Sequence, residues 1–157
     1  MRQSSIDAGS WLFYAWAAAV VATLGSLYLS EVMHFIPCSL CWFQRIFMYP
    51  LVWLLGVASV KRQVEIGVYA LPLVGVGAAF SCYHIYIQEM PSHTLGVACG
   101  PTSCVSDVLN AFGFLTVPML ALTAFLFIGF CMVMAGRSER RSLANIELQP
   151  IQGGGVK

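Results

Sequence analysis

The feature that most constrains the fold of this chain is a set of four long apolar runs. Each run has about the 20 residues that an α-helix needs to cross the hydrocarbon core of a bilayer. A soluble domain of 157 residues could not bury this much apolar surface, because 59% of the residues are hydrophobic and only 10% are charged. We therefore expect an all-α membrane protein, a four-helix transmembrane bundle. The predicted helices are residues 11–29, 42–60, 66–87 and 111–135.

The two ends of the chain need separate interpretation. Arg2 precedes the first run, so a signal peptide is an alternative to a membrane anchor there. The run is longer than the apolar core of a signal peptide and lacks a convincing small-residue cleavage site, which favours the anchor. At the other end, residues 136–157 are polar and include a run of glycines. We predict a flexible cytoplasmic tail there, following a single membrane domain formed by residues 1–135.

The basic residues predict the orientation of the helices. Apart from Arg45, Lys and Arg occur only before the first run, between the second and third, and after the fourth. Four spans put these segments on one side, and the positive-inside rule assigns that side, with both termini, to the cytoplasm. The loops 30–41 and 88–110 contain no Lys or Arg and are expected to be extracytoplasmic. They carry four cysteines into the compartment where disulfides persist, namely Cys38, Cys41, Cys99 and Cys104.

The stretch PCSLCWFQR places a Cys-x-x-Cys pair where the second helix is expected to begin. Pro37 suits the first turn of a helix, so Cys38 and Cys41 fall in the opening turns, where the positive end of the helix dipole stabilises a thiolate. Arg45 lies one turn after Cys41 on the same face and adds positive charge there. The alternative is that the Arg45 side chain extends to the lipid headgroups. The position of Arg45 on the helix face that carries Cys41 favours a role in the chemistry of the cysteines.

A second pair lies in the stretch CGPTSC, where a Gly-Pro step favours a turn that brings Cys99 and Cys104 together. By itself, such a pair is typical of a structural disulfide that braces a loop. Two dithiols on the same face of a small bundle can also exchange disulfides with each other. Four paired cysteines could instead bind zinc, but the outward orientation, the arginine at a helix start and the lack of a small packed domain favour redox chemistry.

The remaining candidates lie inside the runs. His84 is an ionisable residue in the third run and is therefore a functional candidate; the alternative is an interfacial histidine that bonds to a neighbouring helix. Cys82 and Cys131 are expected at different depths, too far apart to form a disulfide, and we predict that both are small packing residues. The aromatic residues that follow Cys41 suit a belt at the membrane interface, or alternatively a surface for a flat cofactor.

Several of these stretches together resemble the disulfide-bond-formation protein B family. The likeness covers residues 11–135 and rests on PCSLCWFQRIFMYPL, YHIYIQ, CGPTSC and FGFLTVPMLALTAF. It is greatest with the Gram-positive branch that is often called disulfide formation protein C. The resemblance implies a multi-pass protein of the bacterial cell membrane that reoxidises an extracytoplasmic thioredoxin-fold thiol oxidase. It also implies that the electrons pass to a membrane quinone, either menaquinone or ubiquinone, and that this sustains disulfide bond formation in exported proteins.

The resemblance implies a role for each of the four outer cysteines. Cys99 would take the mixed disulfide with the partner protein, and Cys104 would complete the loop pair. Cys38 would exchange with Cys104, and Cys41 would donate to the quinone. One departure concerns the loop pair, which is compact here, whereas enterobacterial members space it widely across a longer loop. Because of this departure, the resemblance does not predict how the partner docks or whether a disulfide forms between the two loops.

The same resemblance implies two residues at the quinone. Arg45 would lie beside the quinone headgroup, and His84 falls where a family histidine has been linked to the same site. No metal ligand is predicted.

Other functions remain as alternatives to this one. A non-catalytic membrane protein would use its disulfides only to brace its outer loops, and a zinc-binding membrane protein would hold metal through the same cysteines. A quinone reductase of the vitamin-K-epoxide-reductase type shares the Cys-x-x-Cys chemistry but usually places the motif late in the bundle. Nucleic-acid binding is not indicated, because the formal net charge is only +1.

Overall fold

The described part of the chain is almost entirely helical. The computed structural model describes residues 2–32, 34, 39–89 and 117–148. Within these ranges the helices are α1 (Arg2–Glu31), α2 (Ser39–Lys61), α3 (Val64–Val68), α4 (Ala70–Glu89) and α5 (Val117–Leu148). Four segments are long and apolar enough to cross a membrane, and α3 and α4 together form the third of them. The prediction of an all-α bundle with four membrane-spanning helices is confirmed.

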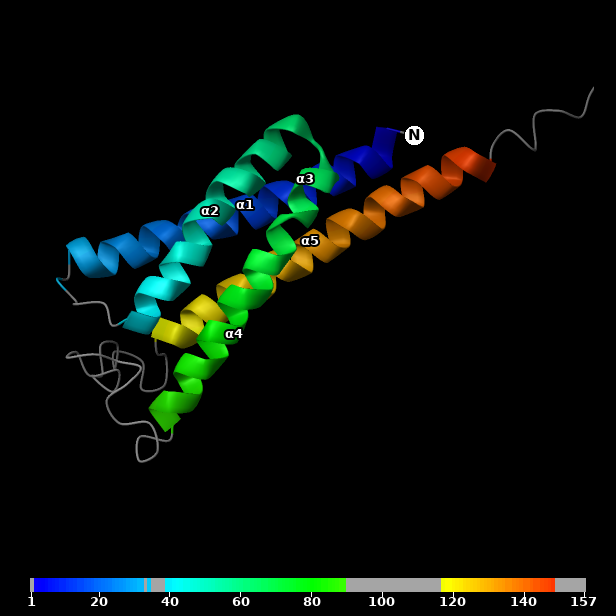
Figure 1. Cartoon of the computed structure of the whole chain (residues 1–157). Coiled ribbons are helices and arrows are strands. Elements are labelled where there is room, and N and C mark those ends of the chain that lie inside the picture. Colours follow the sequence, from blue (N-terminus) through cyan, green and yellow to red (C-terminus); the bar gives the residue numbers. More distant parts are fainter. Residues whose placement is uncertain (1, 33, 35–38, 90–116, 149–157) are drawn as a thin grey trace, which may run out of the picture.

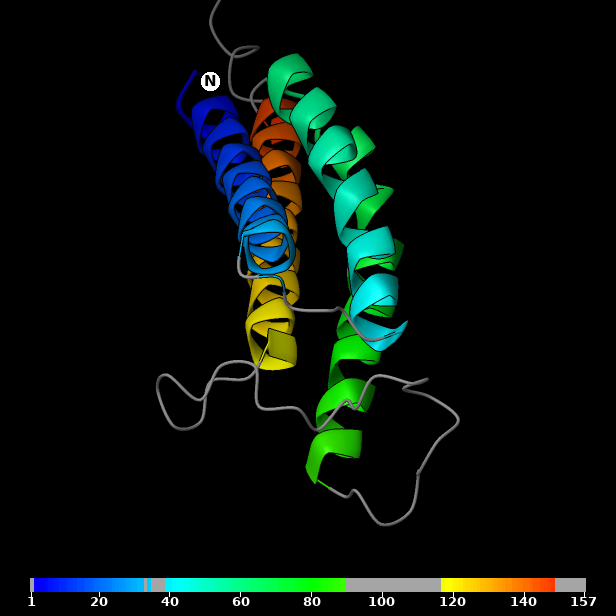
Figure 2. The same ribbon diagram turned by 90° about the vertical axis from the view of Figure 1, so that its left-hand side faces the viewer.

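The helices form a bundle in which each long helix packs against two others. α1 contacts α2 and α5, and α4 contacts the same two helices. Figure 2 shows α1 beside α5 and α2 beside α4, so the bundle has two layers. The start of α1 and the last turns of α5 lie at one end of the molecule, and the end of α1 and the starts of α2 and α5 lie at the other (Figure 1). We refer to the latter as the α2-start end.

A tight turn connects α2 to α3. The backbone N–H of Gln63 donates to the carbonyl of Ala58 at 3.1 Å, and that of Arg62 donates to the carbonyl of Ser59 at 3.3 Å. This pair of bonds is the Schellman arrangement, which needs a left-handed residue just after the helix. Arg62 is that residue, with φ of 53°. The turn reverses the chain within the short loop that the sequence predicts between the second and third runs.

The third run is divided near its start, although the sequence predicts one continuous helix over residues 66–87. α3 ends at Val68, and α4 begins at Ala70. Pro72 has no N–H to donate to the carbonyl of Val68, and its ring crowds that carbonyl. Pro72 lies in the first turn of α4, where a missing donor costs little. The proline therefore ends the short helix and is compatible with the start of the long one.

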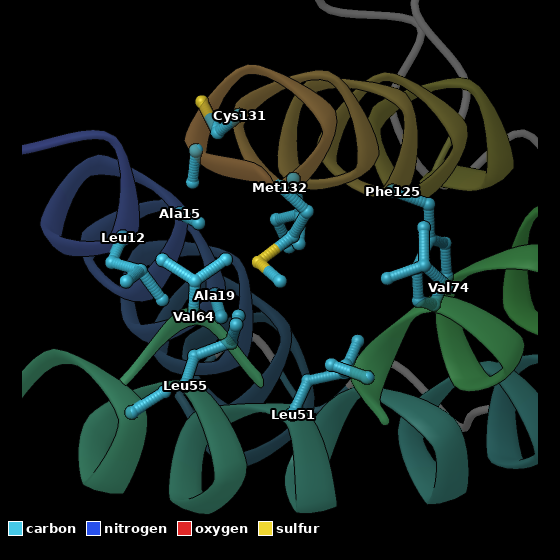
Figure 3. Packing of buried hydrophobic residues seen from close by; sticks show 14 of the residues in the cluster. Leu12, Ala15, Ala19, Leu51, Leu55, Val64, Val74, Phe125, Cys131 and Met132 are labelled. Carbon is cyan, nitrogen blue, oxygen red and sulfur yellow. The ribbon is translucent and has the colours of Figure 1, made fainter. Parts of the chain in front are cut away.

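The bundle core lies where all the helices meet. Figure 3 shows Leu12 of α1, Leu51 and Leu55 of α2 and Met132 of α5 pointing into a common core, and the three leucines are fully buried. Small residues allow the helices to approach closely at this depth, as in other membrane bundles. Large apolar side chains also cover the outside, with Trp53 of α2 79% exposed. Helices that are apolar on the inside and the outside suit a lipid environment.

The last helix differs from the prediction at its far end. α5 continues to Leu148, whereas the sequence analysis places a flexible tail from residue 136 onward. The segment RSERRSLANIEL, residues 137–148, contains no Gly or Pro and is rich in good helix formers such as Arg, Leu, Ala and Glu, so the helix can continue beyond the apolar run. The predicted apolar residues 111–116, and the rest of the tail after residue 148, lie outside the described part of the chain.

Candidate functional site

A cavity of about 1000 Å³ lies between α1, α2 and α5 toward the α2-start end. One part of its wall is polar and consists of Thr23 and Ser26 of α1 and Cys41, Gln44 and Arg45 of α2. Most of the remaining wall is apolar, with alanines of α1 facing leucine, alanine and phenylalanine side chains of α5. The cavity therefore suits a ligand with a polar head and an apolar body, and its volume falls within the range of small-molecule sites.

The helical repeat of α2 brings its polar residues to the cavity. Cys41, Gln44, Arg45 and Met48 follow one another at steps of three, one and three positions, and all four line the cavity. Residues three and four positions apart lie on one face of a helix, about 5–6 Å apart at their Cβ atoms. The half-buried thiol of Cys41 is thus one turn from both the amide of Gln44 and the guanidinium of Arg45.

Arg45 is held against the neighbouring helix α1. Its Nε donates to Oγ of Ser26 at 2.8 Å, and its Nη2 donates to the backbone carbonyl of Ser26, also at 2.8 Å. The guanidinium carbon lies 5.9 Å from the centre of the Trp42 ring, within the range of a cation–π contact. The side chain is therefore fixed across the helix interface, and the alternative in which it extends to lipid headgroups does not describe its position.

The charge of Arg45 is not paired with a carboxylate in the described part of the chain. Among the residues that the structure describes, no carboxylate forms an ion pair with it, and both of its hydrogen-bond acceptors on Ser26 are neutral. Its positive charge therefore remains available to a thiolate or to a ligand oxygen that becomes negative. In a partly buried site such a charge acts more strongly than it would in water.

Two buried polar atoms at the same end of the cavity make no hydrogen bond within the described part of the chain. They are Nε2 of Gln44 and Oγ1 of Thr23. Buried polar groups of folded proteins are nearly always paired, so an exception indicates a functional site. The observed residues fit a quinone: the amide N–H and the hydroxyl suit carbonyl oxygens, Cys41 supplies a thiol, and the alanine-lined wall accommodates an apolar tail.

His84 lies elsewhere in the bundle. It belongs to α4, is only 2% exposed, and is not among the residues that line the cavity. Ser81, His84 and Ile87 share the buried face of α4, and Ile87 packs with Leu40 of α2. Cys41 also packs against this pair, so its side chain lies between the cavity and the α2–α4 contact. The structure brings Cys41 and Arg45 together at the cavity and leaves His84 out of it.

Three of the predicted cysteines, Cys38, Cys99 and Cys104, lie outside the described residues. Their pairing and roles stay predictions. Cys38 immediately precedes α2, and the other two lie in the segment between α4 and α5. The described ranges contain no group of three or more His, Cys, Asp or Glu residues that could hold a metal ion.

The two remaining cysteines differ from each other. Cys131 of α5 is fully buried in the bundle core, which confirms its predicted packing role (Figure 3). Cys82 of α4 is exposed, so the prediction that it packs in the interior is wrong. The third run is apolar on all sides, and the sequence therefore does not distinguish the face that meets other helices from the outer face.

Sequence analysis missed three residues of the polar wall. Gln44 could have been found, because it lies three positions after Cys41 and must share its helix face. Thr23 and Ser26 carry no comparable signal. Their place at the cavity depends on which face of α1 packs against α2, and the alanine-rich sequence of α1 leaves that face undetermined.

Comparisons with known proteins agree with this architecture. Residues 8–136 match the family described as disulfide bond formation protein DsbB. The probable disulfide formation protein C 1 of Bacillus anthracis is 51% identical over 121 residues, which cover 76% of this chain and 87% of that protein. The disulfide bond formation protein C of Bacillus subtilis strain 168 is 42% identical over 137 residues, covering 82% and 96%. A probable disulfide formation protein of Coxiella burnetii strain Dugway is 44% identical over 136 residues, covering 85% and 92%.

No solved structure matches the chain. The family match covers the first three candidate membrane spans and most of the fourth, and it includes the cavity with Cys41 and Arg45. With this match and relatives at 42–51% identity over most of their length, the chain belongs to the disulfide bond formation protein DsbB family.

Proposed function

We propose that the chain is a membrane thiol:quinone oxidoreductase that reoxidises an extracytoplasmic thioredoxin-fold thiol oxidase and passes the electrons to menaquinone or ubiquinone. Family membership supports the general role, which is disulfide bond formation by a multi-pass membrane protein. The observation that carries the specific proposal is the shared cavity: Cys41 and Arg45 line one space of about 1000 Å³ whose wall is otherwise mostly apolar.

The proposed sequence of exchanges begins outside the membrane. The reduced partner attacks the disulfide between Cys99 and Cys104, becomes oxidised, and leaves these two cysteines as thiols. The loop dithiol then reduces the disulfide between Cys38 and Cys41 by the same kind of exchange. Each exchange breaks one disulfide and forms another, so two electrons and two protons move together toward the start of α2.

The residues at the cavity perform the last step. Cys41 lines the cavity, and the charge of Arg45, one helical turn away, would stabilise its thiolate form. Ser26 holds the guanidinium in place through its two hydrogen bonds. A quinone held in the cavity would supply the electron acceptor for the two electrons and two protons of the Cys38 and Cys41 thiols. The disulfide between Cys38 and Cys41 is thereby restored.

The location of the site explains why two disulfides would be needed. The thiols of a soluble partner are in water, whereas a quinone with an isoprenoid tail is in lipid. A cysteine pair in a loop can meet the partner, and a cysteine at the first turns of a membrane helix can meet the quinone. Cys41 lies in the first turn of α2, at the end of the bundle where α4 ends and α5 begins (Figure 1).

The direct test is a quinone-reduction assay with purified protein in lipid nanodiscs. Reduced thioredoxin-fold thiol oxidase and a short-chain quinone are added, and quinone absorbance is followed. We expect the wild-type protein to consume quinone and Cys41→Ser to lose this activity. Cys82→Ser is the matched control, because it makes the same change at an exposed cysteine of α4 and should retain activity.

Two results would contradict the proposal. If the wild-type protein consumed neither a benzoquinone nor a naphthoquinone, the chain would not be a quinone reductase. If Cys41→Ser and wild type were equally active, the cysteine pair would have a structural role, as the non-catalytic alternative requires. Stoichiometric zinc in the purified protein would favour the metal-binding alternative instead.

A further inference from the structure

The amide of Gln44 lies at the cavity wall without a hydrogen bond to its Nε2 in the described part of the chain. The side chain is only 5% exposed, and its Nε2 atom is buried. A buried donor left unpaired destabilises a protein, which makes an apolar residue the more stable choice at such a position. Packing alone therefore does not explain why a polar side chain occupies this position.

The neighbouring part of the wall, which α1 contributes, has the same property. Oγ1 of Thr23, on α1, is buried and has no hydrogen-bond partner among the described residues. Thr23 lies one turn before Ser26, which binds Arg45. Thr23 and Gln44, from different helices, thus both line the cavity and each carries a buried polar atom without a hydrogen-bond partner among the described residues. This arrangement suits a ligand that brings hydrogen-bond acceptors to these two groups.

We propose that Gln44 is a positioning residue that donates a hydrogen bond from Nε2 to a ring carbonyl oxygen of the quinone. The inference rests on the proposed function, since it names a specificity determinant of the same site. Two of the three guanidinium nitrogens of Arg45, Nε and Nη2, already donate to Ser26. The Nε2 group of Gln44, in contrast, donates no hydrogen bond within the described part of the chain.

The position of Gln44 determines what its hydrogen bond would achieve. It lies three positions after Cys41 on the same helix face, which separates their Cβ atoms by about 5–6 Å. A ring whose carbonyl is held by Gln44 therefore has an edge within reach of the Cys41 sulfur. The bond fixes the ring against the thiol, and a ring without the carbonyl oxygen would leave the amide unpaired and gain no such orientation.

The experiment compares ligand affinity with the stability of the ligand-free protein. The variants are Gln44→Leu and Gln44→Met, which remove the amide at similar volume. The control is Ile46→Leu, an apolar exchange at an exposed position of α2 that does not line the cavity. The probes are a decyl-substituted benzoquinone and the matching decylbenzene, which has hydrogen in place of each carbonyl oxygen. Binding to protein in nanodiscs is measured by equilibrium dialysis, and stability by thermal unfolding without ligand.

We expect both Gln44 variants to bind the quinone about three- to tenfold more weakly, the loss of about one hydrogen bond. Their affinity for the decylbenzene should equal that of the wild type, and their unfolding temperature should be unchanged or higher. Ile46→Leu should bind both probes within about twofold of the wild type. A glutamine with a purely structural role would not produce this combination of lower quinone affinity and undiminished stability.

Three outcomes would overturn the inference, and the last of them would also contradict the proposed function. Equal quinone affinity in wild type and both Gln44 variants shows that the amide makes no bond to the ring. Equal losses for quinone and decylbenzene, or a lower unfolding temperature in both variants, assign Gln44 to packing. If the wild-type protein itself prefers the decylbenzene or binds no quinone, the proposed function fails as well.

Discussion

Arg45 of α2 and Ser26 of α1 are joined by two hydrogen bonds of 2.8 Å, although they lie 19 positions apart in the chain. One bond ends on the serine hydroxyl and the other on its backbone carbonyl. The pairing fixes both the position and the plane of the guanidinium, because two donors of a rigid planar group meet two acceptors of one residue. The charge beside Cys41 is therefore positioned by the neighbouring helix α1, which lines the same cavity.

The first prediction concerns the hydroxyl of Ser26. Ser26→Ala removes the acceptor of Arg45 Nε and keeps the carbonyl acceptor of Nη2, so the guanidinium gains freedom without losing its charge. We expect KM for quinone to rise about fivefold, as the loss of one charge-assisted hydrogen bond suggests, with a smaller change in kcat. The measurement is steady-state quinone reduction at varied quinone concentration.

Ser30→Ala is the matched control for this variant. Ser30 also lines the cavity, one turn further along α1, but its hydroxyl donates to the carbonyl of Leu27 in its own helix at 3.1 Å. Its removal should leave KM within about twofold of the wild type, because only a local bond on one helix is lost. Similar increases in KM for the two variants would show that Ser26 does not act through Arg45.

The second prediction separates the charge of Arg45 from its geometry. Arg45→Lys keeps the positive charge but cannot form two parallel bonds to Ser26, whereas Arg45→Met removes both the charge and the bonds. We expect kcat/KM for quinone to fall about tenfold in the lysine variant and about a hundredfold in the methionine variant. Equal activities for the two variants would mean that the charge contributes nothing to the reaction.

The third prediction concerns the close approach of α4 and α5. A Cβ atom at Gly77 of α4 would overlap the ring of Phe125, which is fully buried in α5. Gly77→Ala should therefore lower the free energy of unfolding by about 1–3 kcal/mol, the usual cost of overpacking a core. Unfolding in mixed micelles with increasing denaturing detergent provides the measurement.

Gly75→Ala is the control for that variant, on the same helix and only two positions away. A Cβ at Gly75 would meet nothing within 4 Å. Alanine there should be neutral or should stabilise the helix by up to about 1 kcal/mol, since it has the higher helix propensity. A loss of stability at both positions would indicate that glycine is needed for another reason than the contact with Phe125.

The fourth prediction concerns the turn after α2. Arg62 has a φ of 53°, a conformation that costs an ordinary residue roughly 1–2 kcal/mol and costs glycine almost nothing. Arg62→Gly should therefore raise the free energy of unfolding by about 1 kcal/mol. Lys61→Gly removes the same charge from the adjacent position, inside α2, and should be neutral or destabilising. If the two variants changed stability alike, the effect would come from the charge and not from the backbone.

Sequence reasoning succeeded for properties that depend on neighbouring residues. Four helices follow from the length and apolar character of each run, since a segment in lipid must satisfy its own backbone. The shared face of Cys41 and Arg45 follows from the helical repeat alone. Pro72 carried a signal for the break between α3 and α4, and it was missed because a proline near a helix start is compatible with either one helix or two.

The sequence alone determined the number of membrane helices, the family resemblance and the helix face on which a thiol and a guanidinium meet, because these depend on local composition and spacing. The tertiary structure decided that Ser26 binds Arg45, that Thr23 completes the polar wall, and that His84 lies outside the cavity. The reason is that these helices are apolar on every side. Which faces meet is therefore decided by close packing and a few interhelical hydrogen bonds between segments far apart in the chain.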